Sequence, residues 1–448
     1  MGLADDGGLM VPESIPDVSD RLDAWRALSY EDLACEVMAL YAGDLPREDL
    51  RKLVERTYGE SYGGPVAPVV RVGPLYVLEL WHGPTLSFKD VALQFLGNLF
   101  EYILGRTGGR LNVLGATSGD TGSAAICGCR GRAGIRVFMM HPKGRVSQIQ
   151  ERQMTTVLDE NVHNIAVEGS FDDCQRILKS LASDLEFKRA CSLGAVNSIN
   201  WARILAQMVY YFKAVPEVRE ATGAERVAVC VPTGNFGNVL SAWYAMRMGL
   251  PIERLILASN ENDILARFFT TGRYSRRRVH HTLSPAMDIQ VASNFERYLY
   301  HRVGSDPVRL GELMRSFAQT GALEVQPEPD GAVDHNFAAG VGTVEDCLAT
   351  IGRCWREHGY LLDPHSAIGV AVAERVYKNG APVLCVATAH PAKFPEAVQR
   401  AVGRDAACHP AIEALRDLPT RCATLPNDEE AVRRFMMSVV TATDCECR

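Results

Sequence analysis

Lys89 is the residue whose position in the sequence most clearly points to chemistry. It lies in "LYVLELWHGPTLSFKDVALQFL" (75–96), where a short apolar run breaks at His82-Gly83-Pro84 and a helical apolar pattern begins at Ala92. Because the flanking residues are apolar, we expect the lysine to be partly desolvated. Desolvation lowers the pKa of a lysine and frees its amine as a nucleophile or base. A surface lysine beside Asp90 at a helix start is the alternative.

A second candidate is the glycine-containing segment "PTGNFGN" (232–238), which follows an apolar run and precedes a helical pattern. Its central residues can turn several backbone N–H groups toward one point: Gly234, Asn235, Phe236, Gly237 and Asn238. The following helix adds its positive N-terminal end, so the segment predicts a phosphate site. It is neither a P-loop nor a Rossmann fingerprint, because the required glycine and lysine spacings are absent. A tight turn that binds nothing is the alternative.

The segment "GATSGDTGS" (115–123) has the same placement between a strand pattern and a helix pattern. Glycines allow close backbone approach here, and the hydroxyl residues supply donors: Thr117, Ser118, Thr121 and Ser123. We expect a second anion pocket, sized for a carboxylate, or else only a capped helix start. Asp120 is unusual in an anion pocket and either caps the helix or contacts a cation. A reactive lysine with both pockets suggests a Schiff base with a phosphorylated aldehyde cofactor, acting on an amino acid.

The elements that must position these residues alternate along the chain. From about residue 75, short β-branched or apolar runs alternate with helical patterns, which predicts βαβ units and buried, mainly parallel sheets. We expect a mostly helical N-terminal domain (1–72), an α/β region (73–435) and a loosely ordered tail (436–448). The segment 325–342 reads as a surface excursion or linker. Lys89 would then lie at the carboxyl ends of parallel strands, where such sheets bind ligands.

Composition narrows the class of protein further. The 448 residues carry a net charge of −7, which gives no electrostatic reason to expect nucleic acid as a partner. No apolar run reaches the roughly 18–20 residues that span a bilayer, and the start has no signal-peptide pattern. The thirteen cysteines are scattered and odd in number, so we expect free thiols, no metal site and a cytoplasmic location.

Several motifs together resemble one family. "HGPTLSFKDVALQ", "GATSGDTGSAA", "HPKGRVSQIQERQMTT", "NSINWARI", "VPTGNFGNV", "LSPAMDIQVASNFER", "GYLLDPHSAIG" and "ATAHPAKFPEAV" are similar, in order, to the threonine synthases, above all the bacterial ones. The match covers roughly residues 2–430. This resemblance implies the α/β fold type II of pyridoxal phosphate (PLP) enzymes, which is tryptophan synthase β-like. It has parallel sheets with helices on both faces and two subdomains with the cofactor between them. The resemblance also implies an N-terminal segment that this sequence lacks, so we expect a truncated form.

The resemblance also implies roles for individual residues. Lys89 would bind PLP as a Schiff base, and Thr388 would face the pyridine nitrogen. The remaining assignments are the phosphate ligands Gly234, Asn235, Phe236, Gly237 and Asn238, and the substrate-carboxylate ligands Ser118, Gly119, Asp120 and Thr121, with Thr85 nearby.

The implied reaction converts O-phospho-L-homoserine and water to L-threonine and phosphate. Lys143 and Arg145, in "HPKGRVS", are candidates to receive the departing phosphate, with a sheet-edge surface pair as the alternative. The nearest rival is a threonine synthase-like phospholyase that releases 2-oxobutyrate, ammonia and phosphate. A catalytically inactive binding protein on the same scaffold is a further rival. We expect no membrane partner, and either a monomer or a homodimer.

Overall fold

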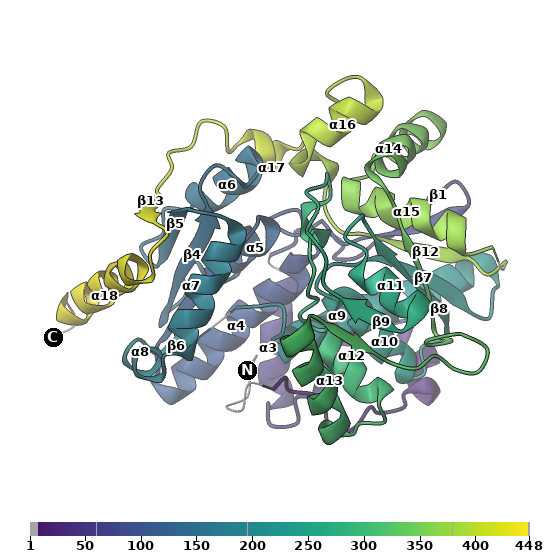
Figure 1. Ribbon diagram of the computed structural model, residues 1–448, viewed down its shortest axis with the longest axis horizontal. Coiled ribbons are helices and arrows are strands. Elements are labelled where there is room, and N and C mark those ends of the chain that lie inside the picture. The colour runs from purple at the N-terminus through teal and green to yellow at the C-terminus, as the bar shows by residue number, and fades with distance from the viewer. Residues whose placement is uncertain (1–7, 60, 195, 379, 447–448) are drawn as a thin grey trace. The chain divides into compact units, whose positions relative to one another are not determined.

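The computed structural model describes residues 8–59, 61–194, 196–378 and 380–446. The chain forms two compact units: Met1–Ala92 with Ser198–Cys408, and Leu93–Asn197 with His409–Arg448. Each unit contains its own sheet of mainly parallel strands, with helices packed on it (Figure 1). The predicted α/β class is therefore confirmed. In the described part of the chain, no helix is both long and apolar enough to cross a membrane.

The first unit is built on a six-stranded sheet. Its strand order is β1 (Val69–Val72), β2 (Leu75–Glu79), β12 (Val383–Ala387), β7 (Val227–Pro232), β8 (Ile252–Ser259) and β11 (Phe337–Val341). Strand β1 pairs antiparallel with β2, and all other neighbours are parallel. The carboxyl ends of β2, β12, β7 and β8 therefore lie next to one another along one edge of the sheet, the edge formed by strand ends. Open α/β sheets bind ligands at this edge.

The helices of the first unit form two groups along the chain, one that precedes the sheet and one that alternates with its strands. The N-terminal helices are η1 (Ser19–Arg21), α1 (Leu22–Trp25), α2 (Tyr30–Ala39), α3 (Arg47–Val54) and η2 (Glu55–Gly59). The later ones are α9 (Trp201–Thr222), α10 (Gly237–Arg247), α11 (Ile264–Thr271), η3 (Pro285–Met287), α12 (Phe295–Arg302), α13 (Pro307–Thr320), α14 (Val344–His358), α15 (Pro364–Val376), η4 (Pro391–Lys393) and α16 (Pro395–Val402). Strands β9 (Arg273–Ser275) and β10 (Ala322–Glu324) form a separate antiparallel pair.

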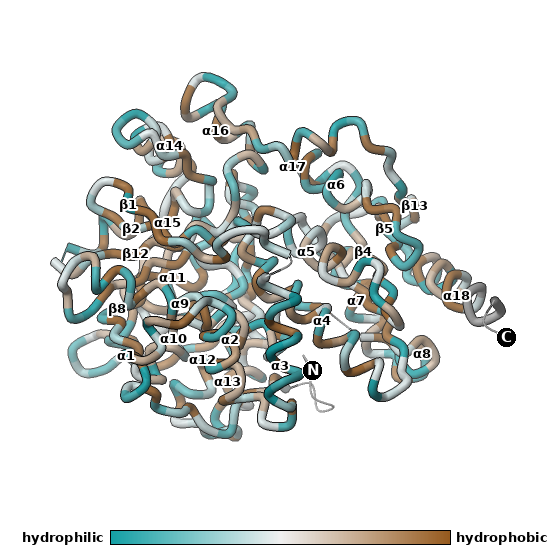
Figure 2. Tube along the Cα trace, turned by 180° about the vertical axis from the view of Figure 1, so that it is seen from behind, coloured by the Kyte–Doolittle hydropathy of each residue, from teal (hydrophilic) through white to brown (hydrophobic). Residues whose placement is uncertain are grey.

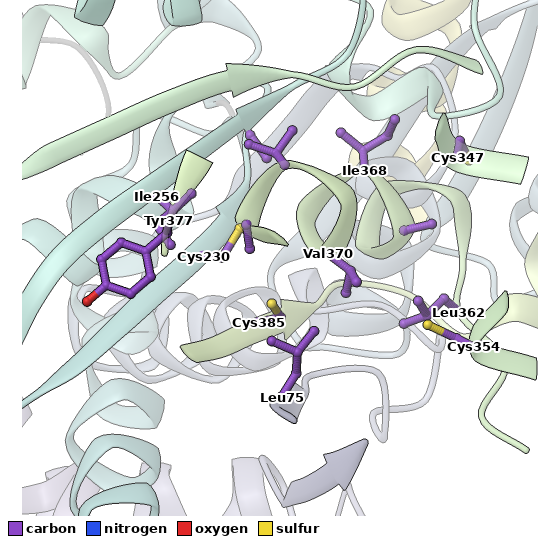
Figure 3. Close-up of a cluster of buried hydrophobic side chains, with 14 of the residues drawn as sticks. Leu75, Cys230, Ile256, Cys347, Cys354, Leu362, Ile368, Val370, Tyr377 and Cys385 are labelled. Carbon is purple, nitrogen blue, oxygen red and sulfur yellow. The ribbon is translucent and has the colours of Figure 1, made fainter. Parts of the chain in front are cut away.

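A buried cluster joins α14 and α15 to the first sheet. Figure 3 shows this cluster, which includes Ile368 and Val370 of α15, Cys230 of β7 and Cys385 of β12. These cysteines, with Cys347 and Cys354, are free and buried. Burial raises the pKa of the Cys347 thiol to about 12 and that of Cys354 to about 11. The thiols of Cys347 and Cys354 are therefore neutral and act as apolar packing groups.

The second unit is built on a five-stranded parallel sheet. Its strand order is β13 (Ala423–Pro426), β5 (Val162–Glu168), β4 (Ile135–Pro142), β3 (Leu111–Ala116) and β6 (Leu193–Gly194). Its helices are α5 (Asp120–Cys129), α6 (Gln148–Thr155), α7 (Phe171–Ser183), α8 (Leu185–Ala190), α17 (Pro410–Glu413) and α18 (Glu429–Glu446). Helix α4 (Lys89–Thr107) begins in the first unit and continues in the second.

Two segments differ from the expectations for them. Residues 436–446, expected as a loose tail, continue α18, because Val432, Met436 and Val440 recur at helical spacing and are buried. Figure 2 shows hydrophobic and hydrophilic residues mixed along this helix. The segment 325–342, expected as a surface excursion, contains β11, which pairs with β8. The division into 1–72 and 73–435 remains a proposal, since the first unit draws on both stretches.

Candidate active site

Lys89 lies where the chain passes from β2 into α4. It is the first residue of α4 and is 8% exposed. Its Nζ lies 4.6 Å from the centre of the Phe88 ring. The structure therefore shows the desolvation that the apolar flanks predicted, and desolvation favours the neutral, nucleophilic amine.

A rigid turn leads into Lys89. The Asp90 carboxylate accepts hydrogen bonds from the backbone N–H of Thr85 (2.8 Å) and from its hydroxyl (2.8 Å). The Thr85 carbonyl in turn accepts a bond from Nζ of the buried Lys393 (2.6 Å). Gly83 is required beside this turn, because a Cβ there would overlap the Asp90 side chain. Thr85 is thus held at three atoms, and the turn fixes the direction in which α4 starts.

Thr388 lies beside the Lys89 turn because β12 is the parallel neighbour of β2. The N–H of Phe88 donates to the Thr388 carbonyl (2.9 Å), and Ser87 forms a β-bridge with Ala389. On its other side, the Thr388 N–H donates to the Ser366 hydroxyl (3.1 Å). Thr388 is 6% exposed, and no described residue hydrogen-bonds its hydroxyl. That hydroxyl is available to a ligand at the sheet edge.

The glycine-containing loop follows β7, the next strand in the sheet. Phe236 has φ of 64°, in the left-handed region, and its ring is buried against Phe269, Phe295 and Tyr298. This packing holds a backbone conformation that is unfavourable for a bulky residue. The loop ends at α10, whose first-turn N–H groups have no partner within the helix. The start of α10 therefore presents backbone donors and the positive end of the helix dipole, an arrangement that suits an anion.

Two contacts hold the loop in place from outside. The Asn235 carbonyl accepts from the backbone N–H of Asn294 (3.1 Å) and from its Nδ2 (3.2 Å). The backbone carbonyl of Ala286 lies directly against Gly234, and a Cβ on Gly234 would collide with it. The loop is thus clamped between two other segments of the first unit, and only glycine fits at position 234.

Asn238 presents an unpartnered donor at the end of this loop. It is 6% exposed, and its Oδ1 accepts from the hydroxyls of Tyr210 (2.5 Å) and Tyr211 (2.5 Å). Burial raises the pKa of both tyrosines well above the ordinary value, so both hydroxyls stay protonated and donate. This fixes the amide so that Nδ2 is the free end, and Nδ2 is buried without a partner. A buried donor without an acceptor is costly, so the site suits an anionic ligand.

The hydroxyl-rich segment 115–123 forms a tight loop in the second unit, between β3 and α5. The Thr117 hydroxyl accepts from the N–H groups of Gly119 (3.0 Å) and Gly122 (2.9 Å), which curls the backbone around it. Gly119 has φ of 149°, and Asp120 Oδ1 accepts from Gln150 Nε2 (2.8 Å). The side chain of Ser118 is exposed and that of Thr121 is half-buried. Their hydroxyls are therefore accessible at the start of α5.

Lys143 and Arg145 follow β4, the parallel neighbour of β3, so they lie at the same edge of the second sheet as residues 118–121. Lys143 Nζ forms an ion pair with Glu168 Oε1 (2.9 Å), and both side chains are more than half exposed. Arg145 is also exposed. An exposed ion pair is what the surface alternative predicts, and the proposed phosphate role of these residues stays a prediction.

The structure thus assembles the predicted residues in two groups. Lys89, Thr388 and the loop 234–238 share one edge of the first sheet, and residues 118–121, 143 and 145 share one edge of the second. Sequence reasoning missed the residues that hold the first group: Asp90, Tyr210, Tyr211, Asn294, Asp363, His365, Ser366 and Lys393. An aspartate followed by a proline is a sequence signal for a helix N-cap, and it marks Asp363. No local sequence signal marks the contacts of Tyr210 and Tyr211, because these contacts join two separate helices.

Comparisons with known proteins agree with this arrangement. Three family models match in chain order: "Threonine synthase N terminus" over residues 1–58, "Pyridoxal-phosphate dependent enzyme" over 66–334, and "Threonine synthase, C-terminal" over 366–436. Threonine synthase from Pseudomonas aeruginosa is 45% identical over 440 residues, covering 97% of this chain and 93% of that protein. The chain belongs to the threonine synthase family. It is an enzyme of threonine biosynthesis, a lyase whose cofactor is PLP.

Solved structures extend the match to the fold. The PLP-bound threonine synthase of Brucella melitensis is 44% identical with a TM-score of 0.93, covering 98% of this chain and 95% of that one. The yeast enzyme is 40% identical with a TM-score of 0.92 over the same shares of the two chains. Threonine synthase-like 2 of Xenopus laevis is 37% identical, over 89% of this chain and 86% of that protein. Maize serine racemase, 13% identical with a TM-score of 0.54, shares the type II fold alone.

The first group of residues fits this cofactor. Lys89 offers a desolvated amine for an aldehyde, and Thr388 offers a hydroxyl on the neighbouring strand. The loop offers backbone N–H groups, a helix N-terminus and the unpartnered Nδ2 of Asn238 for a phosphate. The separation of these functions over three adjacent strands matches a ligand with a reactive aldehyde, a ring and a phosphate.

The tyrosine pair provides a first prediction. Replacing Tyr210 and Tyr211 together with phenylalanine removes both donors to Asn238 Oδ1, so the amide loses its fixed orientation. We expect the double variant to bind PLP about tenfold more weakly, with a smaller loss for each single variant. Equilibrium titration of PLP into stripped protein measures this. Tyr41→Phe is the control, because its hydroxyl contacts Met248 and not the loop. An unchanged affinity in the double variant would contradict the orienting role.

Proposed function

We propose that this enzyme converts O-phospho-L-homoserine and water to L-threonine and phosphate. One observation carries the proposal: the cluster of Lys89, Thr388 and the glycine-containing loop occurs in a chain that is 45% identical, over 440 residues, to a threonine synthase. Bound PLP supplies an electron sink for the carbanion that forms at the α-carbon. The protein must then position substrate and move protons.

Lys89 has the central role in this proposal. Its Nζ would hold the cofactor, and the same amine would take the proton from the substrate α-carbon. The buried position supports this role, because desolvation disfavours the charged form of an amine. The Thr388 hydroxyl would bind the pyridine nitrogen. A hydroxyl there, in place of a carboxylate, would leave that nitrogen largely unprotonated and moderate the electron sink. The loop 234–238 would hold the cofactor phosphate.

The substrate contacts come from the remaining predicted residues. Ser118, Gly119, Asp120 and Thr121 bind the substrate carboxylate, and Thr85 is a further substrate ligand. The loop curled around Thr117 supports this assignment, because it orders hydroxyls and N–H groups at the start of α5. Lys143 and Arg145 receive the departing phosphate, which carries about two negative charges. We further propose a cytoplasmic location, which the free thiols of the described cysteines support.

The two basic residues can be tested separately. Replacing Arg145 or Lys143 with alanine removes a charge that would attract the substrate phosphate, so we expect KM for O-phospho-L-homoserine to rise about tenfold with a smaller change in kcat. Lys188→Ala, an exposed lysine of the same unit, is the control. Steady-state kinetics at low ionic strength measures the effect. Equal KM values in all three variants and the wild type would favour the surface-pair alternative.

The reaction itself is tested by product identity. Purified, PLP-loaded enzyme is incubated with O-phospho-L-homoserine, and phosphate, threonine and 2-oxobutyrate are assayed together. We expect phosphate and threonine in equal amounts. Phosphate matched by 2-oxobutyrate would identify a phospholyase and overturn the proposal. No phosphate release at all would overturn it in favour of an inactive scaffold.

A further inference from the structure

The motif "GYLLDPHSAIG" contributes a buried carboxylate to the first unit. Asp363 is 1% exposed and is the N-cap of α15, followed by Pro364 at the first helical position. Its Oδ1 accepts from the backbone N–H of His365 (2.9 Å) and from His365 Nδ1 (2.8 Å). Its Oδ2 accepts from the backbone N–H (3.4 Å) and the hydroxyl of Ser366. The carboxylate therefore holds two side chains as well as the helix end.

The first of these side chains leads to Thr388. The Ser366 hydroxyl donates its hydrogen to Asp363, which leaves its lone pairs free to accept the Thr388 N–H at 3.1 Å. The Thr388 carbonyl then accepts from Phe88, the residue before Lys89 (2.9 Å). A change in the Ser366 hydroxyl would therefore shift the strand end that carries Thr388.

The second side chain leads to the glycine-containing loop. Because His365 Nδ1–H donates to Asp363, its Nε2 is an acceptor, and it takes the N–H of Ala286 at 3.2 Å. One neutral tautomer satisfies both ends of the ring. The carbonyl of Ala286 lies directly against Gly234. His365 thus fixes the segment that forms the wall behind the loop.

Helix capping does not account for these contacts. Asp306 caps α13 with the same Asp-Pro start, and among the described residues it accepts only from the backbone N–H groups of Val308 (2.9 Å) and Arg309 (3.2 Å). Asp306 is exposed, whereas Asp363 is almost completely buried, and burying a carboxylate is costly unless it is well hydrogen-bonded. Serine caps a helix about as well as aspartate does. The side-chain bonds of Asp363 therefore point to a second task.

We propose that Asp363 is a positioning residue for the cofactor: through Ser366 it sets Thr388 at the ring, and through His365 it sets Ala286 against the phosphate-binding loop. This role of Asp363 rests on the proposed function in one respect: the assignment of the PLP ring to Thr388 and of the PLP phosphate to the glycine-containing loop. One buried carboxylate thereby couples the two walls of the cofactor site, so that ring and phosphate are held at a fixed spacing.

The test compares PLP binding in variants that keep a helix cap. Asp363→Ser retains the cap and removes the carboxylate, and Asp306→Ser is the matched control at the other Asp-Pro helix. Each protein is stripped of PLP and titrated, and the absorption band and the ³¹P resonance of bound PLP are recorded. We expect the dissociation constant of PLP to rise about tenfold or more for Asp363→Ser and to stay unchanged for Asp306→Ser. A similar loss of thermal stability in both, with PLP binding unchanged, would show that Asp363 is only a cap.

Variants of Ser366 and of His365 test separately the two hydrogen-bonded connections from Asp363. They also decide whether Asp363 positions the cofactor if Asp363→Ser does not fold. Ser366→Ala removes the acceptor of the Thr388 N–H, so we expect a shifted absorption band with a nearly unchanged ³¹P resonance. His365→Asn keeps the donor to Asp363 but loses the acceptor for Ala286, so we expect a shifted ³¹P resonance and weaker PLP binding. His365→Gln places its side-chain oxygen near the Nε2 position but lacks the donor to Asp363, so it should recover the ³¹P resonance and PLP binding only in part. Wild-type spectra and affinity in Ser366→Ala and His365→Asn would overturn the proposal.

These measurements do not depend on which products the enzyme forms. Failure to make threonine from O-phospho-L-homoserine would overturn the proposed function while the PLP titrations and spectra still tested Asp363. Conversely, normal threonine production with unaltered PLP binding in all the variants would overturn the role of Asp363 alone.

Discussion

Replacing Lys89 with alanine is expected to lower kcat/KM for threonine formation by at least about 10³-fold, because the variant lacks the amine that attaches PLP and moves the α-proton. The fold should survive, since the change shortens a single side chain at the first position of α4. We expect thermal stability to change little. Steady-state kinetics measures the first effect, and thermal unfolding of the stripped protein measures the second.

A covalent readout and a second variant sharpen this test. Borohydride reduction of the PLP-loaded wild type should attach the cofactor to the peptide that contains Lys89, and mass spectrometry should find no such adduct in Lys89→Ala. Lys89→Arg keeps the positive charge but cannot act as a neutral amine, so it should be equally inactive. Lys52→Ala, an exposed lysine paired with Glu48, is the control. Full activity in Lys89→Ala would refute the proposed mechanism.

Replacing Gly234 with alanine is expected to have the second largest effect. The new Cβ would collide with the backbone carbonyl of Ala286, and backbone atoms cannot move aside as a flexible side chain can. The loop must therefore shift, and overpacking of this kind typically costs about 1–3 kcal/mol. We expect PLP affinity to fall roughly 10- to 100-fold, in proportion to that cost.

The control for this prediction is Gly43→Ala. Gly43 has no positive φ and no neighbouring atom within 4 Å of an added Cβ, so the same substitution there should leave PLP binding and stability nearly unchanged. PLP titration and thermal unfolding are measured on both variants in parallel. If Gly234→Ala bound PLP as tightly as Gly43→Ala, the clamp formed by Ala286 would not constrain the loop.

The sequence predicted the fold class and the local placement of the site residues well. Alternating apolar runs and helical patterns report βαβ units directly, because side-chain periods of 2 and 3.6 residues are local properties. The break at His82-Gly83-Pro84 correctly placed Lys89 between a strand and a helix, and the loop 232–238 lies between β7 and α10. Glycine and turn chemistry also acts over a few residues, so it can be read without a structure.

Local sequence patterns predicted secondary structure less well in segments that are buried by residues far away in the chain. Strand β11 contains Ala338, Ala339 and Gly340, whose small side chains give no clear strand signal, and its pairing with β8 alone makes it a strand. Residues 436–446 form a helix because Met436 and Val440 pack into the core of the second unit, beside Ile177 and Leu181. In both cases tertiary contacts outweighed weak local preference.

By itself, then, the sequence predicted a lysine between apolar flanks, two glycine-containing turns with the pattern of anion sites, and buried parallel strands, because each is encoded by residues close together in the chain. Only the tertiary structure decided which of these lie together. The strand order β2-β12-β7 brings Lys89, Thr388 and Gly234 to one sheet edge, although strand order depends on contacts between segments hundreds of residues apart. The bonds from His365 and Ser366 to Asp363 are local, but tertiary packing buries this group and joins it to Thr388 and Ala286, which converts a simple helix cap into a support for the site.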